Sequence, residues 1–366
     1  MELKGAGADR TVAILTKYFR CPGDLVSVAR LEQGHINSTW VATYSQAGRP
    51  VRYLVQQING EVFNTTILVR NMELLLDHLG SRLSHLPDAS RRTLTLLATR
   101  TRYPERLYCD SVGLYWRVML YIEESISVEQ IDTPRQAHTA AYAFGHFVSL
   151  LRDLQPRQLG ETIPYFHDVG RRYQALEAAW AQADDSRRTR AATLYAAATR
   201  HAAIVAQMNR LIAEGMPLRV VHNDAKIGNL LLDAHTGEGL CVIDWDTVMP
   251  GYVLYDFGDL VRSCASPVPE DSTDLEAIVV RREVLQALVD GYLAGAGNLL
   301  LPVERANLLF GGLLMTYLMA LRFLTDDLQG NVYYHTAYPD HNFDRARNQF
   351  RLLDLLAEHP LMVRWR

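Results

Sequence analysis

The spacing of hydrophobic residues divides the chain into a strand-rich first third and a helical remainder. Over the first 120 residues, apolar positions alternate with polar ones or form short runs, as strands do. One segment, 64–79, instead has apolar residues at helical spacing, with Asn64 or Thr65 at its N-cap position. The strands are predicted at 24–33, 37–46, 52–59, 92–100 and 114–125.

Beyond Glu124 the pattern has a helical period. The first helix predicted there, 133–154, starts at a Thr-Pro pair and ends before Pro156. A β-rich segment, from Val220 to Asp256, interrupts the later helices. Those helices are predicted at about 171–215, 274–294, 303–324 and 342–358.

The order of these elements predicts an α+β fold with two lobes. A small antiparallel β lobe, residues 1–121, is followed by a short connector near Tyr121–Ser125. A larger, mainly helical lobe, residues 122–366, then carries the β-rich segment as a hairpin.

Composition narrows the classes of function. With 48% apolar and 21% charged residues, the chain is typical of a globular protein with a sizeable core. The net charge is −4 and the arginines are scattered, so neither a nucleic acid nor a membrane surface is expected as a partner. The four cysteines are far apart, which argues against a disulfide framework or a zinc site.

Two segments bear on localisation. The first 19 residues lack the apolar core of a secretion signal. The most apolar stretch, between Arg305 and Arg322, has 16 residues and falls short of the ~20 that span a bilayer. We therefore expect a buried core helix in a soluble, cytoplasmic protein, either a monomer or a small homo-oligomer.

The β-rich segment carries the candidate chemistry. Its apolar strands NLLL and GLCVID are joined by the turn DAHTGEG, and antiparallel pairing would bring Asn229 beside Asp244. Asp224 precedes the first strand by five residues, so it would lie at the same rim. In phosphoryl transfer, one carboxylate orients the attacking hydroxyl, and a carboxylate with an amide holds Mg²⁺ against the nucleotide phosphates. The order His222, Asp224, Asn229, Asp244 also has the spacing of a protein-kinase catalytic loop.

The neighbouring acidic residues have other interpretations. Asp246 would share a face with Asp244 on an extended chain, as a second metal ligand or a substrate contact. Asp256 and Asp259 are predicted to hold the backbone of the loop rather than to take part in catalysis. Polar residues at the turns of an ordinary hairpin remain the alternative explanation for the whole segment.

These residues resemble a known superfamily. HNDAKIGNLLLD, VIDWDTVMPG and YDFGDLVR are similar to the aminoglycoside phosphotransferase and choline kinase superfamily, which has a protein-kinase-like fold. Within it, the chain most resembles the N-acetylhexosamine 1-kinase branch, through GHIN, a strand ending in QQIN, DTVMPG and the C-terminal segment LTDDLQGNVYYHTAYPDHN.

The resemblance implies a role for each matching residue. Asp224 would be the general base, and Asn229 and Asp244 would be the Mg²⁺ ligands of an ATP-dependent kinase. The loop over the nucleotide phosphates would be formed by Gly34, His35, Ile36 and Asn37, with Ser38. The adenine would meet backbone groups of the hinge, from Tyr121 through Glu123 to Glu124.

The third strand departs from the kinase pattern, because it has no lysine to contact the phosphates. Gln56 or Gln57 stands in its place, and Glu73 of the following helix could pair with the glutamine amide. This change fits either a feature of the branch or a degenerate pseudokinase.

The acceptor site is expected near the C-terminus. The resemblance implies that Arg322, Tyr333 and His35 contact the sugar while Asp224 receives the reacting hydroxyl. The alternatives are that Arg322 closes its helix and pairs with Asp326 or Asp327, that the tyrosine packs in a loop, and that the histidine caps a turn.

Three functions follow for comparison. The first is an ATP-dependent N-acetylhexosamine 1-kinase, which forms the sugar 1-phosphate from GlcNAc or GalNAc in carbohydrate metabolism. The second is another small-molecule kinase of the superfamily, acting on a different sugar, an aminoglycoside or an amino alcohol. The third is a non-catalytic nucleotide-binding protein, against which the intact Asp224, Asn229 and Asp244 argue.

Overall fold

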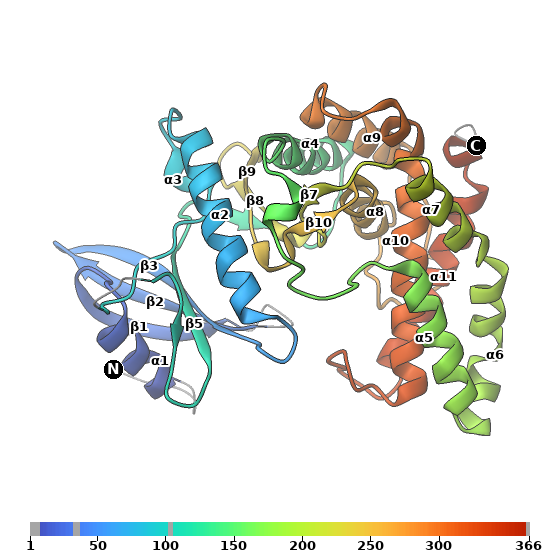
Figure 1. Ribbon diagram of the computed structural model, residues 1–366, viewed down its shortest axis with the longest axis horizontal. Helices are drawn as coiled ribbons and strands as arrows, with labels where there is room; N and C mark the ends of the chain where they lie inside the picture. Colours follow the sequence, from blue (N-terminus) through green and yellow to red (C-terminus); the bar gives the residue numbers. More distant parts are fainter. Residues whose placement is uncertain (1–7, 32–36, 102–104, 364–366) are drawn as a thin grey trace. The chain divides into compact units, whose positions relative to one another are not determined.

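The computed structural model describes residues 8–31, 37–101 and 105–363 (Figure 1). Contacts between Cα atoms separate two compact units. Unit 1 comprises the chain up to Ser125 with Leu159–Ile163, and unit 2 comprises Ile126–Gln158 with Pro164–Arg366. The short return into unit 1 is fixed by hydrogen bonds between the Asn71 side chain and both backbone groups of Gly160.

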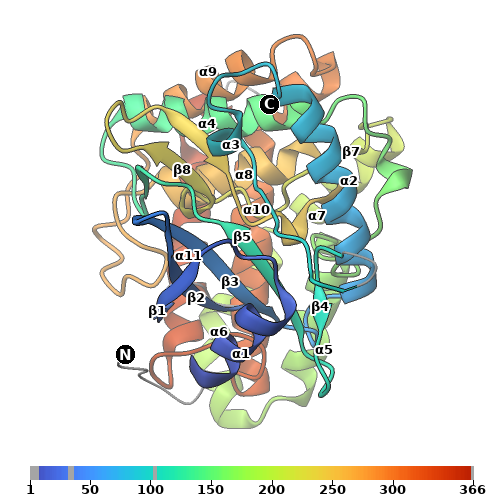
Figure 2. The same ribbon diagram turned by 90° about the vertical axis from the view of Figure 1, so that its left-hand side faces the viewer.

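Unit 1 is built on a five-stranded antiparallel sheet in the order β1-β2-β3-β5-β4 (Figure 2). One face of the sheet packs on the first helix, in a core that includes Phe19, Trp40, Val55, Trp116 and Val118. The elements of unit 1 are α1 (Ala8–Tyr18), β1 (Asp24–Leu31), β2 (Ser38–Gln46), β3 (Arg49–Ile58), α2 (Thr65–Leu83), α3 (Ala89–Arg92), β4 (Tyr108–Cys109) and β5 (Tyr115–Leu120).

The structure differs from the sequence prediction in two places in this unit. First, the helices α1 and α3 were not predicted. The predicted helix α2 does begin as expected, because its N-cap is Asn64, one of the two residues expected there. Residues 92–100 form no continuous strand, because β4 already pairs with the first residues of β5. Residues 92–100 can therefore pair only with the C-terminal end of β5, where Leu96 forms a single β-bridge to Met119.

Unit 2 is mainly helical. Two small sheets, β6-β8-β9 and β7-β10, lie among its helices. Its elements are β6 (Ser125–Ser127), α4 (Pro134–Leu150), α5 (Val169–Gln182), α6 (Asp185–Arg200), α7 (Ala203–Ala213), β7 (Arg219–Val221), β8 (Leu230–Asp233), β9 (Gly239–Val242), β10 (Met249–Gly251), α8 (Val253–Cys264), α9 (Arg282–Ala296), α10 (Pro302–Gln329), α11 (His341–Glu358) and α12 (Pro360–Val363).

The predicted helix 171–215 is in fact three helices, because aspartates start two of them. Asp168 accepts a hydrogen bond from the Arg171 N–H at the start of α5, and Asp184 accepts one from the Arg187 N–H at the start of α6. Each side chain satisfies a helix N–H that has no partner within the helix, so each marks a new beginning.

Helix α10 is the centre of unit 2 and packs on α8, α11 and α5 (Figure 1). Among the described residues it alone is long and apolar enough to cross a membrane, but 78% of its most apolar window is buried inside the protein. The predicted core helix is thus confirmed. It runs to Gln329, so Arg322 lies about two turns before its end and does not close it.

The helix α8 was not predicted, yet it positions the candidate site. It crosses α10 so closely that a Cβ on Gly258 would lie 2.1 Å from the backbone oxygen of Gly311. Glycine is therefore required at this crossing. The close packing of the two helices places the acidic side chains of α8 under the β-rich segment.

Candidate active site

Asp256, at the start of α8, holds the loop that precedes β8. Its two carboxylate oxygens accept hydrogen bonds from the backbone N–H groups of His222, at 2.9 Å, and Asn223, at 2.7 Å. Burial raises the pKa of Asp256 to about 6, against the opposing effects of His222 and these hydrogen bonds. The predicted role of Asp256 in holding the loop backbone is confirmed.

Asn223 turns the chain immediately before the candidate base. Its φ angle is 62°, a left-handed conformation that asparagine tolerates better than most residues. The side-chain amide donates to the carbonyl oxygens of Thr247 and Met249, at 3.1 and 3.2 Å. The turn is thereby fixed to the segment that follows Asp244.

His222 connects the same two segments from the other side. Its Nε2–H donates to the carbonyl oxygen of Ile243 at 2.8 Å, and its Nδ1 accepts from the Asp224 N–H at 3.3 Å. The ring is completely buried against Phe144 and Phe147. This histidine therefore positions Asp224 and is not exposed to a reacting group.

Asp224 carries the carboxylate around which the site is arranged. Its Oδ2 accepts from the amide of Asn229 at 2.8 Å and lies 3.1 Å from the Nζ of Lys226. Burial would raise the pKa of Asp224, but the charge of Lys226, the neighbouring His222 ring and hydrogen bonds from Lys226 and Asn229 lower it to about 2. The carboxylate is ionised at neutral pH and remains partly open to solvent.

Lys226 was missed by the sequence analysis. It lies two residues beyond Asp224, and the carboxylates of Asp224, Asp244 and Asp259 raise its pKa. Its position between Asp224 and Asn229 was the available signal, because a lysine two residues after the candidate base contributes a cation to the site.

The hairpin brings Asn229 and Asp244 to one rim. The Ile243 N–H donates to the Asn229 carbonyl oxygen at 2.9 Å, and Asp244 is the next residue. Asn229 uses its amide N–H₂ for Asp224, which leaves the amide oxygen as an acceptor, and Asp244 is exposed. An amide oxygen and an exposed carboxylate are the hard oxygen ligands that Mg²⁺ prefers, so these residues fit the ion.

The prediction for Asp246 is wrong in its geometry. Asp244 has a left-handed conformation, with φ 62° and ψ 60°, and a tight helical turn over Trp245–Thr247 follows. Asp246 is therefore buried, with 1% of its surface exposed, whereas Asp244 is exposed. Asp259 also differs from the prediction, because its carboxylate binds the Arg262 guanidinium at 2.7 Å and not the loop backbone.

A second group of residues in unit 2 surrounds Arg322. The guanidinium lies 4.9 Å from the ring centre of Phe166, 5.7 Å from Tyr333 and 5.4 Å from Tyr334. Its one hydrogen bond within the described chain is a long contact of 3.8 Å to the sulfur of Met319. We call this group the arginine cluster; its members are Phe166, His167, Arg172, Arg322, Tyr333 and Tyr334.

The alternative pairing of Arg322 with the aspartates of its own helix is wrong. Asp326 accepts hydrogen bonds from the backbone N–H groups of residues 332–334. Asp327 forms an ion pair with Arg190. Both carboxylates are used elsewhere, and Arg322 is left facing aromatic rings.

His167 and Arg172 were also missed, and no motif marked them. The Nε2–H of His167 donates to the carbonyl oxygen of Asn223 at 2.7 Å, while its buried Nδ1 has no partner among the described residues. Burial lowers the pKa of His167 to about 3, and the charge of Arg322 acts in the same direction. The cluster is thereby tied to the catalytic loop through one hydrogen bond.

Arg172 brings a second guanidinium into the cluster. Its terminal N–H₂ donates to the carbonyl oxygen of Phe166 at 3.1 Å, but within the described chain its buried Nε has no hydrogen-bond partner. Burial lowers the pKa of Arg172, and so does the charge of Arg322. The hydroxyl oxygen of Tyr334 is likewise buried and unpartnered in the described part of the protein.

In unit 1 the structure selects between the two glutamines. Gln56 faces Arg117 across the sheet, and the Arg117 Nε–H donates to the Gln56 amide oxygen at 2.8 Å. Gln57 lies on the opposite face, beside Ser38. Glu73 is exposed on α2, and the pair expected between it and Gln56 is not formed: Gln56 binds Thr39 and Arg117 instead.

The remaining predicted residues of unit 1 have different outcomes. Gly34 and His35 lie outside the described residues, whereas the Asn37 side chain accepts from the Asn59 N–H at 3.0 Å. In the predicted hinge, the Arg52 guanidinium stacks on Tyr121 at 4.0 Å and forms an ion pair with Glu123. Their contacts with nucleotide stay predictions.

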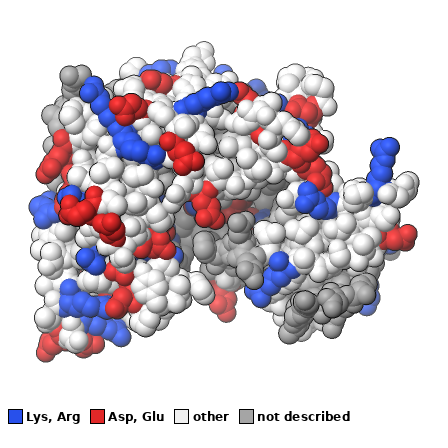
Figure 3. Space-filling model, turned by 180° about the vertical axis from the view of Figure 1, so that it is seen from behind, with Lys and Arg blue, Asp and Glu red and all other residues white. Residues whose placement is uncertain are grey.

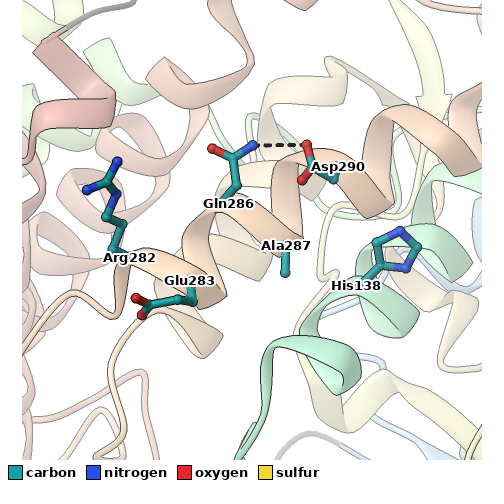
Figure 4. Close-up of a pocket in the computed structure, with 6 residues that line it drawn as sticks. All are labelled: His138, Arg282, Glu283, Gln286, Ala287 and Asp290. Atoms are coloured by element: carbon teal, nitrogen blue, oxygen red, sulfur yellow. Dashed lines mark hydrogen bonds between the residues drawn. The ribbon is translucent and has the colours of Figure 1, made fainter.

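One pocket of unit 1 is lined in part by Ser38 and Gln57, and another lies on α9 of unit 2. On the face drawn in Figure 3, acidic and basic side chains are interspersed, as the scattered arginines predicted. Figure 4 shows a pocket of about 430 Å³ on α9, and no predicted site residue lines it. It is lined by His138, Arg282, Glu283, Gln286, Ala287 and Asp290.

Comparison with known proteins gives one family and one fold. Residues 27–299 match the model of the phosphotransferase enzyme family. A microcompartment-associated aminopropanol kinase has a TM-score of 0.63 at 17% identity, with 98% of both chains covered. A spectinomycin phosphotransferase bound to ADP and spectinomycin has a TM-score of 0.60 at 11% identity, covering 96% of this chain and 97% of that one.

A choline/ethanolamine kinase family protein from Mesorhizobium loti has a TM-score of 0.55 at 18% identity, covering 98% of this chain and 97% of that one. At these identities the likeness is one of fold. The predicted α+β, protein-kinase-like fold is confirmed.

Proposed function

Because the chain belongs to the phosphotransferase enzyme family, we propose that it transfers the γ-phosphoryl group of ATP to the anomeric hydroxyl of an N-acetylhexosamine. The observation that carries this proposal is the carboxylate of Asp224, ionised, partly exposed and fixed by Asn229 and Lys226. GlcNAc and GalNAc are the acceptors of this class, and the product is the sugar 1-phosphate.

In the reaction, the acceptor oxygen forms a bond to the γ-phosphorus while the bond from that phosphorus to the β,γ-bridging oxygen breaks and ADP leaves. Asp224 orients the hydroxyl and takes its proton. The charge of Lys226, next to Asp224, stabilises the negative charge of the transferred group. Asn229 and Asp244 would hold Mg²⁺, which neutralises phosphate charge when it is bound.

The surroundings of Asp224 favour an acidic hydroxyl as acceptor. A carboxylate held by the Lys226 cation and the Asn229 amide, both of which lower its pKa, is a weak base. The anomeric hydroxyl is the most acidic hydroxyl of a reducing sugar, so it needs the least help in losing its proton. A 1-kinase therefore fits this site better than a kinase acting on an ordinary alcohol.

The arginine cluster favours a neutral, carbonyl-bearing acceptor over an amine. Arg172 and Arg322 bring two guanidinium groups into the cluster, and no ion pair links either of them to a carboxylate in the described chain. Two guanidinium groups repel the ammonium groups of aminoglycosides and amino alcohols, but they donate well to an acetamido oxygen or to sugar hydroxyls. Tyr333, 54% exposed, offers a ring face for stacking on the sugar. The second candidate, a kinase for a cationic acceptor, is therefore less favoured.

The nucleotide is proposed to bind unit 1, as the predicted division into a lobe of residues 1–121 and a lobe of residues 122–366 implies. The segment from Asn37 to Ser38 would meet the phosphates, and the backbone between Tyr121 and Glu123 would meet the adenine.

A sugar panel tests the proposal. With ATP and Mg²⁺, GlcNAc or GalNAc should produce ADP while the reducing-sugar signal falls in a one-to-one ratio, because the anomeric carbon becomes blocked. ADP formation with a persisting reducing end would show a different regiochemistry. ADP formation only with an amino alcohol or an aminoglycoside would favour the second candidate, and no turnover with any acceptor would favour a non-catalytic protein.

A further inference from the structure

Three side chains of unit 1 stand in a row across the sheet. Thr39 of β2 pairs with Gln56 of β3, and Gln56 pairs with Arg117 of β5. Residues directly opposite one another in antiparallel strands point to the same face. The opposite face holds Trp40, Val55 and Val118, which pack on α1, so the row lies on the side of the sheet away from that core.

The row has a defined direction. A guanidinium only donates, so the 2.8 Å hydrogen bond from Arg117 fixes the amide oxygen of Gln56 toward β5. The amide nitrogen then points toward β2, where it donates to the Thr39 hydroxyl at 3.2 Å. One of its two N–H groups makes this bond, and the other is available for a ligand.

The row also contains a cation on β5, directly opposite the third-strand residue that stands where a typical kinase has lysine. Arg117 is 1% exposed, and its guanidinium places a positive charge beside Gln56. In a typical kinase the lysine is held by a glutamate of the following helix. Here Glu73 is exposed and the held group is Gln56, so the partner and the cation both come from the sheet.

We propose that Arg117 replaces the missing lysine as the positioning cation of the nucleotide site. It turns the N–H₂ of Gln56 toward the β2 side, from which the chain leads back to Asn37, and its charge stabilises the nucleotide phosphates in a region of low dielectric. The ligand it serves is the diphosphate portion of ATP or ADP. Gln56 makes the contact, and Arg117 acts through it.

A purely structural role is the competing explanation, since a buried arginine that braces three strands would also be needed for folding. A substitution that keeps the brace but cancels the charge separates the two. In Gln56→Glu, the new carboxylate can accept the same hydrogen bond from Arg117, and the pair becomes neutral.

The first measurement is the affinity for ADP with Mg²⁺, by titration calorimetry without an acceptor, together with the thermal midpoint. Gln56→Glu should bind ADP about 10- to 100-fold more weakly, as for the loss of a charge-assisted bond, without a fall in thermal midpoint. Unchanged ADP affinity in this variant would overturn the proposal. Gln182→Glu, the same change at an exposed residue of α5 in unit 2, is the matched control and should bind ADP within about twofold of the parent.

The second measurement moves the cation. Arg117→Gln should weaken ADP binding as Gln56→Glu does, and the double variant Gln56→Lys with Arg117→Gln returns a lysine to the third strand. The double variant should recover most of the lost affinity, because the charge is restored while the original brace is not. If the double variant binds ADP no better than Arg117→Gln, the charge is not the cause and the proposal fails.

These tests do not depend on the acceptor. A failure of the sugar panel leaves the ADP measurements intact, and a failure here leaves the anomeric phosphorylation proposed above untouched.

Discussion

The catalytic loop and the arginine cluster lie in the same unit but differ in how their polar groups are satisfied. From His222 to Asn229 the polar groups bind one another, and Asp256 takes two backbone N–H groups at once. In the arginine cluster, by contrast, Arg172 Nε, His167 Nδ1 and the Tyr334 hydroxyl are buried without partners in the described chain. Buried polar atoms without partners cost free energy, and a ligand that supplies hydrogen-bond partners would recover it.

This difference in hydrogen bonding indicates which of the two regions is preorganised in the absence of a ligand. Under the proposed function, the loop holds the reacting groups in fixed positions before any substrate arrives, as electrostatic preorganisation requires. Under the same proposal, the acceptor supplies the missing hydrogen bonds of the arginine cluster, so the cluster is suited to selecting it. Substitutions in the loop should therefore reduce turnover, and those in the cluster should reduce acceptor affinity.

The largest effect is expected at the proposed metal site. Asp244→Ala should bring turnover below detection and should make nucleotide affinity insensitive to Mg²⁺, because an exposed carboxylate beside Asn229 is lost. Calorimetric titration of ADP with and without Mg²⁺ checks this. An unchanged dependence on Mg²⁺ would remove Asp244 from the metal site. Asp185→Asn, at a carboxylate that is 96% exposed on α6, is the matched control.

Asp224→Asn should lower the turnover number by about 10²- to 10⁴-fold, the usual contribution of a general base. ADP affinity should stay nearly constant, because the carboxylate faces Asn229 and Lys226 within unit 2. Steady-state kinetics with the active sugar, beside an ADP titration, separates the two effects. Retention of more than about a tenth of the parent turnover would contradict the assignment of the base.

A smaller effect, on the free energy of unfolding, is expected at Asp256, the carboxylate that holds the loop backbone. Asp256→Asn replaces an acceptor of two N–H groups by an amide that can accept with one atom only, so the free energy of unfolding should fall by roughly 1–3 kcal/mol. Denaturant titration at neutral pH measures this change, and a stability equal to the parent's would show that the clamp is dispensable.

The same residue predicts a pH dependence. Its pKa is about 6 in the native state against 3.8 for the ordinary group, so the native state binds this proton more tightly. The stabilisation from protonating Asp256 is therefore complete below pH 4 and is lost as the pH rises through 6. The difference in unfolding free energy between parent and Asp256→Asn should change across pH 4–6 and be constant above it. A difference that does not vary with pH would contradict the raised pKa.

The catalytic loop could be predicted from the sequence because its geometry is local. Asp224, Asn229 and Asp244 belong to one loop and one hairpin, so spacing and antiparallel pairing bring them together. The prediction for Asp246 was wrong for an equally local reason. Asp244 has a left-handed conformation, which turns a chain that was expected to be extended. A conformation of that kind is set by the hydrogen bonds around it and not by the pattern of apolar residues.

The rest of the site depends on contacts that spacing does not reveal. Arg117 meets Gln56 from a strand 61 residues away, and His167 meets Asn223 over a separation of 56 residues. Helix α8 was missed although its sequence has a helical period, because its acidic residues Asp256 and Asp259 were assigned to the preceding loop. The position of Arg322 within α10 was mistaken because that helix continues through Asp326 and Asp327, which are buried and paired.

The smallest effect is expected in the arginine cluster, and it is also the most direct test of the comparison. Arg172→Gln should raise the KM for the acceptor by about tenfold and leave the KM for ATP and the turnover number nearly unchanged. The reason is that its Nε, which has no partner among the described residues, can donate to the acceptor, whereas its terminal nitrogen binds the loop carbonyls of Tyr165 and Phe166. Arg171→Gln is a matched control in the adjacent position, because Arg171 is exposed, stacks on Tyr165 and pairs with Asp168.

If the two variants raise the acceptor KM equally, the effect is one of general charge near the site. If Arg172→Gln instead lowers turnover without changing the acceptor KM, the cluster belongs with the preorganised loop, and the division of labour between the two regions is wrong.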